Sequence, residues 1–220
     1  MRKIITTTFI TLDGVLQAPG GPEEDPVNGF KWGGWSFHYW DEMMGNLMDG
    51  FMQQPFDLLL GRRTYEIFAA HWPYIKNDPV ADRFNQTVKY VVSGKSMELD
   101  WKNSRLVTGD IVAGLKKLKS ENGNDLWVHG SGKLIQTLLA NDLIERIYTW
   151  VFPVMIGTGK RLFAEGSKAQ GLKLVDSKVS STGVIISTYE PAGDLVMGSF
   201  VLDEPTEAEL KRRRRLKEES

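Results

Sequence analysis

The chain has 220 residues, and its 27 basic and 28 acidic side chains give a formal net charge of −1. This balance argues against a strongly basic nucleic-acid-binding surface and against an acidic disordered chain. The absence of cysteine excludes disulfide scaffolds, thiolate metal sites and cysteine nucleophiles. Since no apolar run reaches the roughly 18 residues of a membrane span and the N-terminus lacks a signal-peptide pattern, we expect a cytoplasmic protein with no membrane partner. The three histidines lack metal-ligand spacing, so we predict no metal site.

The first half of the chain predicts strands that alternate with helices. Residues 4–12 are rich in β-branched side chains and indicate a strand, after which a long glycine- and proline-rich loop runs over 15–34. We expect a helix from a Ser36 cap to about residue 53, because apolar side chains recur there near helical spacing. Further strands are expected at 56–60, 87–92 and 106–107, and further helices at 62–72, 78–85 and 110–121.

The second half of the chain predicts a change to antiparallel pairing. A strand at 126–129 leads into a helix that ends near Ala140, and a long strand follows at 144–154. We then expect an antiparallel hairpin at 172–179 and 184–189, one more strand at 197–202 and a terminal helix at 205–217. This order predicts a single α/β domain over 1–203 with a mixed sheet, followed by a charged C-terminal helix or tail at 204–220.

Three turns at strand ends carry residues that suit an anion. Gly61-Arg62-Arg63-Thr64 joins a strand to a helix start, whose free N–H groups and arginines suit phosphate. Gly130-Ser131-Gly132 has the same backbone pattern, and Ser93-Gly94-Lys95 presents a hydroxyl and an ammonium. Each turn by itself is also consistent with ordinary helix starts and tight packing. Together they suit a phosphate-bearing dinucleotide, since ligands of open α/β sheets bind at the carboxyl ends of strands.

Five motifs in this order resemble one family. They are Thr11-Leu12-Asp13-Gly14, Gly61-Arg62-Arg63-Thr64-Tyr65, Val92-Ser93, Val128-His129-Gly130-Ser131-Gly132 and the segment from Pro153 to Phe163. With them the chain, over about residues 1–191, resembles the dihydrofolate reductase superfamily, in the branch similar to the reductase domain of riboflavin-biosynthesis proteins. The resemblance implies a three-layer α/β/α fold with a mixed, mainly parallel sheet that ends in an antiparallel hairpin. It also implies an NADPH-dependent reductase.

The resemblance further implies which residues hold NADPH. The phosphates would contact Gly61, Arg62, Arg63 and Thr64, and the adenosine 2′-phosphate would contact Ser93 and Lys95. The pyrophosphate would lie on Gly130, Ser131, Gly132, Lys133 and Leu134, with the backbone near Leu16 beside the nicotinamide.

The substrate side is predicted from acids and aromatic residues. We expect the proton to come from Asp13 or from Asp41, whose burial on an apolar helix would raise its pKa. The alternatives are a turn residue for Asp13 and a helix-start residue for Asp41. Trp40 and Met44 would line a pocket for a flat ring, and the resemblance adds Thr149 near the substrate.

The resemblance, together with these aromatic residues, implies hydride transfer to a planar pteridine-like, pyrimidine-like or other heteroaromatic substrate. Residues 32–61 contain no lysine or arginine, which disfavours a substrate with a carboxylate or phosphate, although Lys31, Lys160 and Arg161 are possible substitutes. The alternatives are 5-amino-6-(5-phosphoribosylamino)uracil reductase of riboflavin biosynthesis and a nucleotide- or flavin-binding protein without turnover.

Aromatic residues in excess of one small core predict a homodimer. The tail contains four consecutive arginines at 212–215, but its basic residues form i,i+4 pairs with acidic residues such as Glu209–Arg213 and Arg214–Glu218, so we expect a solvated helix and no nucleic-acid partner.

Overall fold

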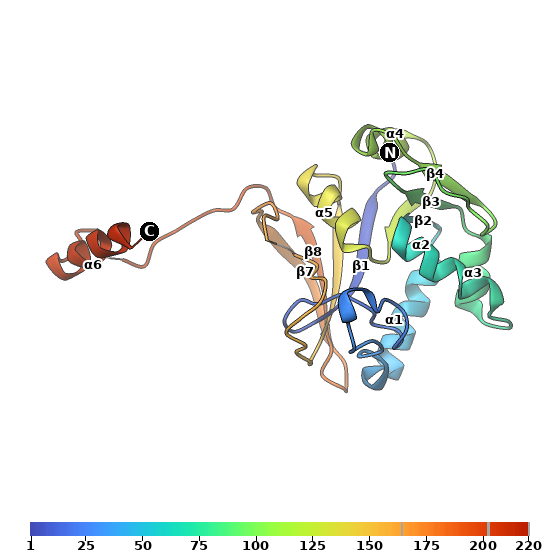
Figure 1. Ribbon diagram of the computed structural model, residues 1–220, viewed down its shortest axis with the longest axis horizontal. Coiled ribbons are helices and arrows are strands. Elements are labelled where there is room, and N and C mark those ends of the chain that lie inside the picture. The colour runs from blue at the N-terminus through green and yellow to red at the C-terminus, as the bar shows by residue number, and fades with distance from the viewer. Residues whose placement is uncertain (164, 202, 220) are drawn as a thin grey trace.

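One mixed sheet organises the molecule (Figure 1), and the structure, a computed structural model, describes residues 1–163, 165–201 and 203–219. Its strand order is β4-β3-β2-β5-β1-β6-β8-β7. The strands are β1 (Ile4–Thr11), β2 (Phe56–Gly61), β3 (Lys89–Val92), β4 (Ser104–Val107), β5 (Asp125–Val128), β6 (Arg146–Phe152), β7 (Leu172–Val179) and β8 (Ile185–Pro191). The first six strands in this order, from β4 through β1 to β6, pair in parallel. β8 pairs antiparallel with both β6 and β7, and β7 is the edge strand. The predicted mainly parallel sheet with a terminal hairpin is confirmed.

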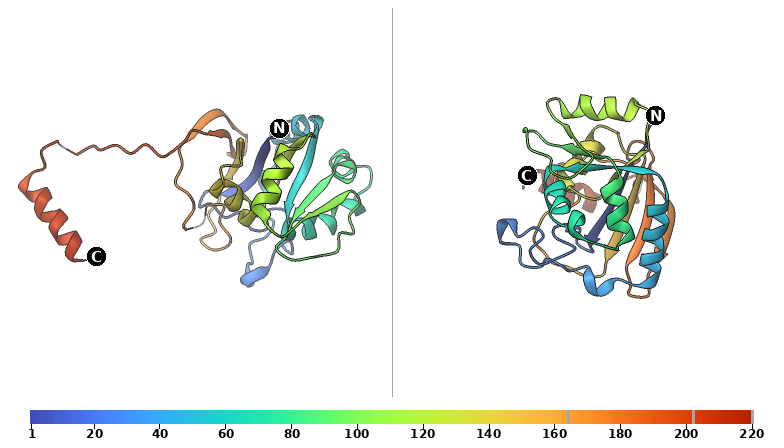
Figure 2. Two further views of the ribbon diagram at one scale, coloured as in Figure 1. Left: turned by 90° about the horizontal axis from the view of Figure 1, so that it is seen from above. Right: turned by 90° about the vertical axis from the view of Figure 1, so that its right-hand side faces the viewer.

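Helices cover both faces of this sheet (Figure 2). They are α1 (Glu42–Gln53), α2 (Arg62–Ala69), α3 (Pro79–Gln86), α4 (Ile111–Ser120), α5 (Gly132–Ala140) and α6 (Glu207–Glu218), with short 3₁₀ turns at Val27–Gly29, Phe37–Tyr39 and Trp72–Tyr74. Buried side chains of α4 and α5 pack on one face of the sheet, and those of α1, α2 and α3 pack on the other. The three-layer prediction is therefore confirmed, while α6 stands apart from the layers (Figure 1).

The central strand β1 alternates between the two cores. Ile4 and Ile10 face α4 and α5, whereas Ile5 belongs to the opposite core. Between them lie Thr6, Thr7 and Thr8, whose buried hydroxyl groups have no hydrogen-bond partner among the described residues. The same alternation decides, for every strand, which face a functional side chain reaches.

Two predicted elements differ from the structure. The helix expected from Ser36 begins only at Glu42, because Asp41 accepts a hydrogen bond from the Met44 N–H and acts as the cap. Residues 197–201 form no strand, since no neighbouring strand pairs with them, and Leu202 lies outside the described residues. Within the described part of the chain, no helix combines the length and the apolar character needed to cross a bilayer.

Candidate functional site

The predicted anion-binding turns lie along one edge of the sheet. Because β2, β3 and β5 are parallel, their carboxyl ends point the same way, and the turns after Gly61, Val92 and Val128 follow those ends. β1 pairs with β5 in the same direction, so the turn after Thr11 lies at this edge too. The arrangement places all four segments where ligands of α/β sheets bind.

Two helix N-termini meet at this edge and form the centre of the site. A Cβ atom added to Gly61 would lie 2.2 Å from the Ser131 Oγ, so the start of α2 touches the turn before α5. Neither Gly61 nor Ser131 caps its helix with a side chain, whereas Asp41, Asp78 and Asp110 cap α1, α3 and α4. The free N–H groups and the positive dipole ends of α2 and α5 therefore face the same space, which suits a pyrophosphate.

A tight backbone shapes the second turn of this site. Gly130 and Ser131 have positive φ angles of 95° and 72°, and the serine adopts a conformation that few non-glycine residues adopt. A Cβ atom added to Gly132 would lie 2.8 Å from Leu16 Cδ2. Leu16 thus packs directly against the glycine turn.

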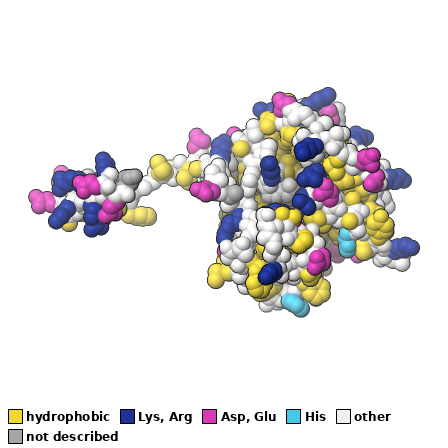
Figure 3. All heavy atoms as spheres, viewed as in Figure 1, with side chains coloured by type: hydrophobic (Ala, Val, Ile, Leu, Met, Phe, Trp, Pro, Cys, Tyr) yellow, Lys and Arg dark blue, Asp and Glu magenta, His cyan; other side chains and the backbone are white. Residues whose placement is uncertain are grey.

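Cationic side chains surround the two helix starts. Arg62, Arg63, Lys95 and Lys133 are exposed, and Arg62 pairs with Glu66 at 3.0 Å. Figure 3 shows Lys and Arg side chains over the middle of the body, in the region of α2 and α5. These side chains make the edge suitable for an anionic ligand.

Three of the predicted cofactor residues offer less than expected. Ser93 is 4% exposed, and its hydroxyl donates to the Lys95 carbonyl at 2.7 Å, so it serves its own turn. Thr64 is 8% exposed. Leu134 belongs to the α5 core cluster, where it contacts other apolar side chains. At positions 64 and 134, the backbone is therefore the part of the residue available to a ligand.

The first turn of the chain is clamped by the segment that follows β6. The Asp13 carboxylate accepts hydrogen bonds from the N–H groups of Ile156 (3.2 Å) and Gly157 (2.7 Å), and Thr11 Oγ1 donates to it at 2.5 Å. The Arg161 guanidinium donates to the Asp13 carbonyl and lies 3.6 Å from its carboxylate. Two family-like motifs far apart in sequence are thus joined at the site.

A second set of contacts extends this clamp. The Lys160 N–H donates to the Gln17 side chain at 3.0 Å, and the Lys160 ammonium pairs with Asp25. Gly159 fits closely beneath Phe30, because a Cβ atom there would lie 2.8 Å from the ring. Gln17 and Asp25 were not predicted as site residues, since nothing in a local pattern shows which residues pair across such a separation.

The two predicted proton donors both occupy structural positions. Hydrogen bonds from Thr11 and from the Gly157 and Ile156 N–H groups lower the pKa of Asp13 below its usual 3.8. The pKa of Asp41 is also lowered, by the Met44 N–H and by Ser181, whose N–H and hydroxyl both donate to the carboxylate. The expectation that burial raises the Asp41 pKa is wrong, because this side chain caps α1 at the surface and ties it to the β7–β8 turn.

The predicted substrate residues differ in exposure and in the face of the sheet they occupy. Trp40 is 44% exposed and stacks on the buried Trp150, with ring centroids 5.9 Å apart and planes at 4°. Met44 is wrong as a pocket residue, since it is 0% exposed within the core of α1. Thr149 is buried and alternates with Trp150, so it faces the α5 side of the sheet, away from Trp40.

His129 adds a neutral group at the edge. It follows β5 on the face of α2 and α3, where its ring lies 5.5 Å from Phe84 and 5.9 Å from Trp127. Burial lowers its pKa to about 4, so the imidazole is uncharged at pH 7. Among the described residues, no cluster of three or more His, Asp or Glu side chains is placed to hold a metal ion.

Comparison with known proteins agrees with this architecture. The chain is 27% identical over 198 residues to the uncharacterised protein YyaP of Bacillus subtilis, which covers 86% of this chain and 94% of YyaP. A putative riboflavin biosynthesis protein from Shewanella sp. PV-4 superposes with a TM-score of 0.60 at 22% identity, over 87% of this chain and 99% of that one. Dihydrofolate reductase from Enterococcus faecalis, complexed with NADP(H), superposes with a TM-score of 0.54 at 13% identity, over 86% and 96%.

The structural matches show a shared fold, and the family follows from the sequence itself. The model of the RibD C-terminal domain matches residues 2–186, from before β1 into β8. This range contains every turn and clamp described above. The chain therefore belongs to the RibD C-terminal domain family and has the dihydrofolate-reductase-like fold.

Proposed function

We propose that the protein is an NADPH-dependent reductase that transfers hydride to a planar heteroaromatic substrate. The observation that carries the proposal is the contact of Gly61 with Ser131, which places two uncapped helix N-termini against one space. Family membership and a fold shared with a reductase in complex with NADP(H) support the same cofactor class. NADPH would supply the hydride, and the protein would bind and orient the reactants.

Different segments of the site would bind different parts of NADPH. The N-termini of α2 and α5 would hold the pyrophosphate, and Arg63, with Arg62 and Lys95, would favour the additional phosphate of NADPH over NADH. The backbone of residues 12–16 would lie beside the nicotinamide, held in place by the contacts of Asp13 with Gly157 and Arg161. We therefore assign Asp13 a positioning role, since its lowered pKa favours the carboxylate over the acid.

The charges near the site favour a substrate without phosphate. Lys160 is paired with Asp25, and Arg161 is engaged by Asp13, so the two cations considered for a substrate phosphate already have acidic partners. Trp40, stacked on Trp150, offers the partly exposed aromatic surface that a flat ring requires. The second candidate, the riboflavin-pathway pyrimidine reductase, is favoured by the family match and would need Lys31 or a rearranged Lys160.

Cofactor titration tests the proposal before any substrate is known. Purified protein would be titrated with NADPH and NADH, with tryptophan fluorescence as the signal. NADPH binding at least about tenfold tighter than NADH binding is the expected result. Binding of neither nucleotide would refute the reductase and leave the glycine turns as packing features. If NADPH binds, oxidation assays with pterins, pyrimidines and flavins then separate the two substrate classes.

A further inference from the structure

His129 carries a polar atom that the fold leaves without a partner. Its Nε2 is buried and forms no hydrogen bond among the described residues, although the residue as a whole is only partly buried. The ring lies among those of Phe68, Phe84 and Trp127, at centroid distances of 6.5, 5.5 and 5.9 Å. Nearly all buried polar groups in native proteins are hydrogen-bonded, so this exception calls for an explanation.

Thr7 places a second atom of this kind on the neighbouring strand. The residue is 4% exposed, and its Oγ1 is buried without a hydrogen-bond partner in the described part of the chain. β1 pairs Thr6 with Val128 of β5, so Thr7 and His129 are the next residues along two parallel strands. Because such strands lie about 4.8 Å apart, the two residues are neighbours across the sheet.

Both side chains reach the face of the sheet that α1, α2 and α3 cover. Thr7 alternates with Ile5 and Phe9, and both of these pack in the cores of that face. His129 follows Trp127 by two residues, and Trp127 belongs to the same face. Two unpartnered polar atoms therefore lie side by side under these helices.

The pair lies between the cofactor edge and the aromatic residues of α1 and β6. His129 directly precedes the glycine turn at 130–132, beside the α5 N-terminus that would hold the pyrophosphate. On the other side, Tyr148 of β6 is the strand partner of Thr7, and its ring lies 4.8 Å from that of Phe51 in α1. A substrate ring bound against α1 and next to the cofactor would thus present its edge to Thr7 and His129.

Resting on the proposed reductase activity, we propose that Thr7 and His129 bind the lactam edge, –NH–C(=O)–, of the planar substrate. A hydroxyl group donates and accepts, and a neutral imidazole has one donor and one acceptor nitrogen. Together they can accept from the ring N–H and donate to the adjacent carbonyl. Burial lowers the pKa of His129 to about 4, which keeps the imidazole neutral at pH 7. The pair selects pyrimidinediones and pteridinediones over flat rings without this edge.

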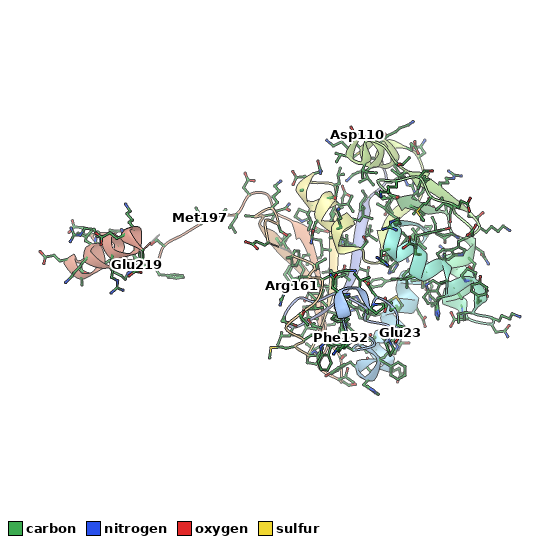
Figure 4. The ribbon with its side chains drawn as sticks, viewed as in Figure 1. Glu23, Asp110, Phe152, Arg161, Met197 and Glu219 are labelled. Carbon is green, nitrogen blue, oxygen red and sulfur yellow. The ribbon has the colours of Figure 1, made fainter. Side chains whose placement is uncertain are left out.

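Both polar atoms are covered by neighbouring side chains, so a substrate reaches them only when one of these moves. Trp40 is suited to this movement, because it is 44% exposed and lies outside the helices and strands. Its ring lies 6.0 Å from that of Phe9, two residues from Thr7. Figure 4 shows Phe152, whose ring is 5.4 Å from Phe9, at the lower end of the body, where α1 lies. Displacement of Trp40 would uncover Phe9 and open a path along β1 toward Thr7.

Matched variants of two adjacent threonines test the hydroxyl group. Thr7→Val keeps the shape and removes the hydroxyl, and Thr6→Val does the same for a buried, unpartnered hydroxyl on the opposite face. With NADPH present, the probe lumazine (pteridine-2,4-dione) should bind Thr7→Val about three- to tenfold more weakly than the unsubstituted chain, and Thr6→Val equally well. Denaturant unfolding should show no loss of stability in either variant. Equal lumazine affinity in the two variants would overturn the proposal.

A pair of variants and a pair of probes test His129. His129→Gln keeps a hydrogen-bonding group near the Nε2 position, whereas His129→Phe keeps only an aromatic ring. The second probe, 1,3-dimethyllumazine, has the ring of lumazine without its N–H groups. Calorimetry should show at least about tenfold tighter binding of lumazine, a preference that His129→Gln retains and His129→Phe loses. Absence of lumazine binding, absence of the preference in the unsubstituted chain, or its survival in His129→Phe would contradict lactam recognition.

Titration of the same proteins with NADPH separates this inference from the proposed function. If the unsubstituted chain binds NADPH but shows no preference for lumazine, recognition of the lactam edge is refuted and the reductase stands. If it binds no NADPH, the reductase itself is refuted, and the lactam recognition that rests on it falls too.

Discussion

The α2–α5 edge and the α1–β6 region are built by opposite means. At the α2–α5 edge, the surface is formed by glycines and backbone N–H groups, and Gly61 and Gly132 let neighbouring segments approach closely because they lack a Cβ atom. In the α1–β6 region, aromatic and methionine side chains fill the space, with Trp150 and Met44 both 0% exposed. The first surface is preformed by backbone geometry, and the second depends on which side chains the packing leaves accessible.

The largest expected effect is a loss of folding stability when a buried side chain of the α1–β6 region is truncated. Met44→Ala should lower the free energy of unfolding by about 2–5 kcal/mol, because it removes a fully buried side chain from the α1 core. Trp40→Ala, at the exposed end of the same stack, should cost less stability and impair turnover more. Denaturant unfolding measures the stability of both variants, and NADPH oxidation measures their turnover. If Met44→Ala kept full stability but bound substrate more weakly, Met44 would instead be a residue that contacts the substrate.

The next effect concerns the glycine contact of the α2–α5 edge. Gly61→Ala should destabilise the fold by about 1–3 kcal/mol and weaken NADPH by tenfold or more, since the new methyl group would overlap Ser131. The control is Gly50→Ala in α1, where an added Cβ has no atom within 4 Å. Equal NADPH affinity in the two variants would mean that the Gly61–Ser131 contact is not part of the nucleotide site.

A smaller effect separates the two arginines after β2. Arg63→Ala should weaken NADPH about tenfold and NADH much less, because no ion pair is described for Arg63 in the part of the chain the structure covers. Arg62→Ala should also weaken NADPH more than NADH, but by a smaller factor, because Arg62 is already paired with Glu66. Lys116→Ala, on α4, is the matched control. Isothermal titration with both nucleotides measures the ratio, and equal losses for NADPH and NADH would contradict phosphate recognition.

The smallest effect concerns Asp13. Its pKa is lowered in the fold, so its stabilising contribution is present above about pH 4 and is lost as the pH falls below the usual 3.8. Asp13→Asn should remove this part of the acid dependence and cost about 1 kcal/mol at pH 7. It should also leave the pH profile of kcat unchanged. Loss of one limb of that profile would instead identify Asp13 as the proton donor.

Sequence alone predicted the sheet, its hairpin and the position of the glycine turns, because backbone geometry leaves local traces. Gly61 and Gly130 stand at strand ends, and such positions are visible in the pattern of residues. The resemblance placed Thr149 near the substrate but could not show which face of β6 it occupies, since a shift of one residue reverses a strand side chain. Asp41 was expected to be buried, but its contact with Ser181 joins positions 140 residues apart, which no local pattern reveals. The division between single domain and tail at 203 stays a prediction.

The position of β1 has a consequence for how the protein is made. This strand pairs Ile4 with Leu126 and Ile5 with Arg146, so every ladder partner is translated more than a hundred residues after it. During that interval β1 remains an unpaired strand in the nascent chain. The run Thr6–Thr7–Thr8, whose hydroxyl groups have no hydrogen-bond partner among the described residues, makes the unpaired strand less apolar than a run of valine or isoleucine would, and polar groups in such a segment disfavour aggregation.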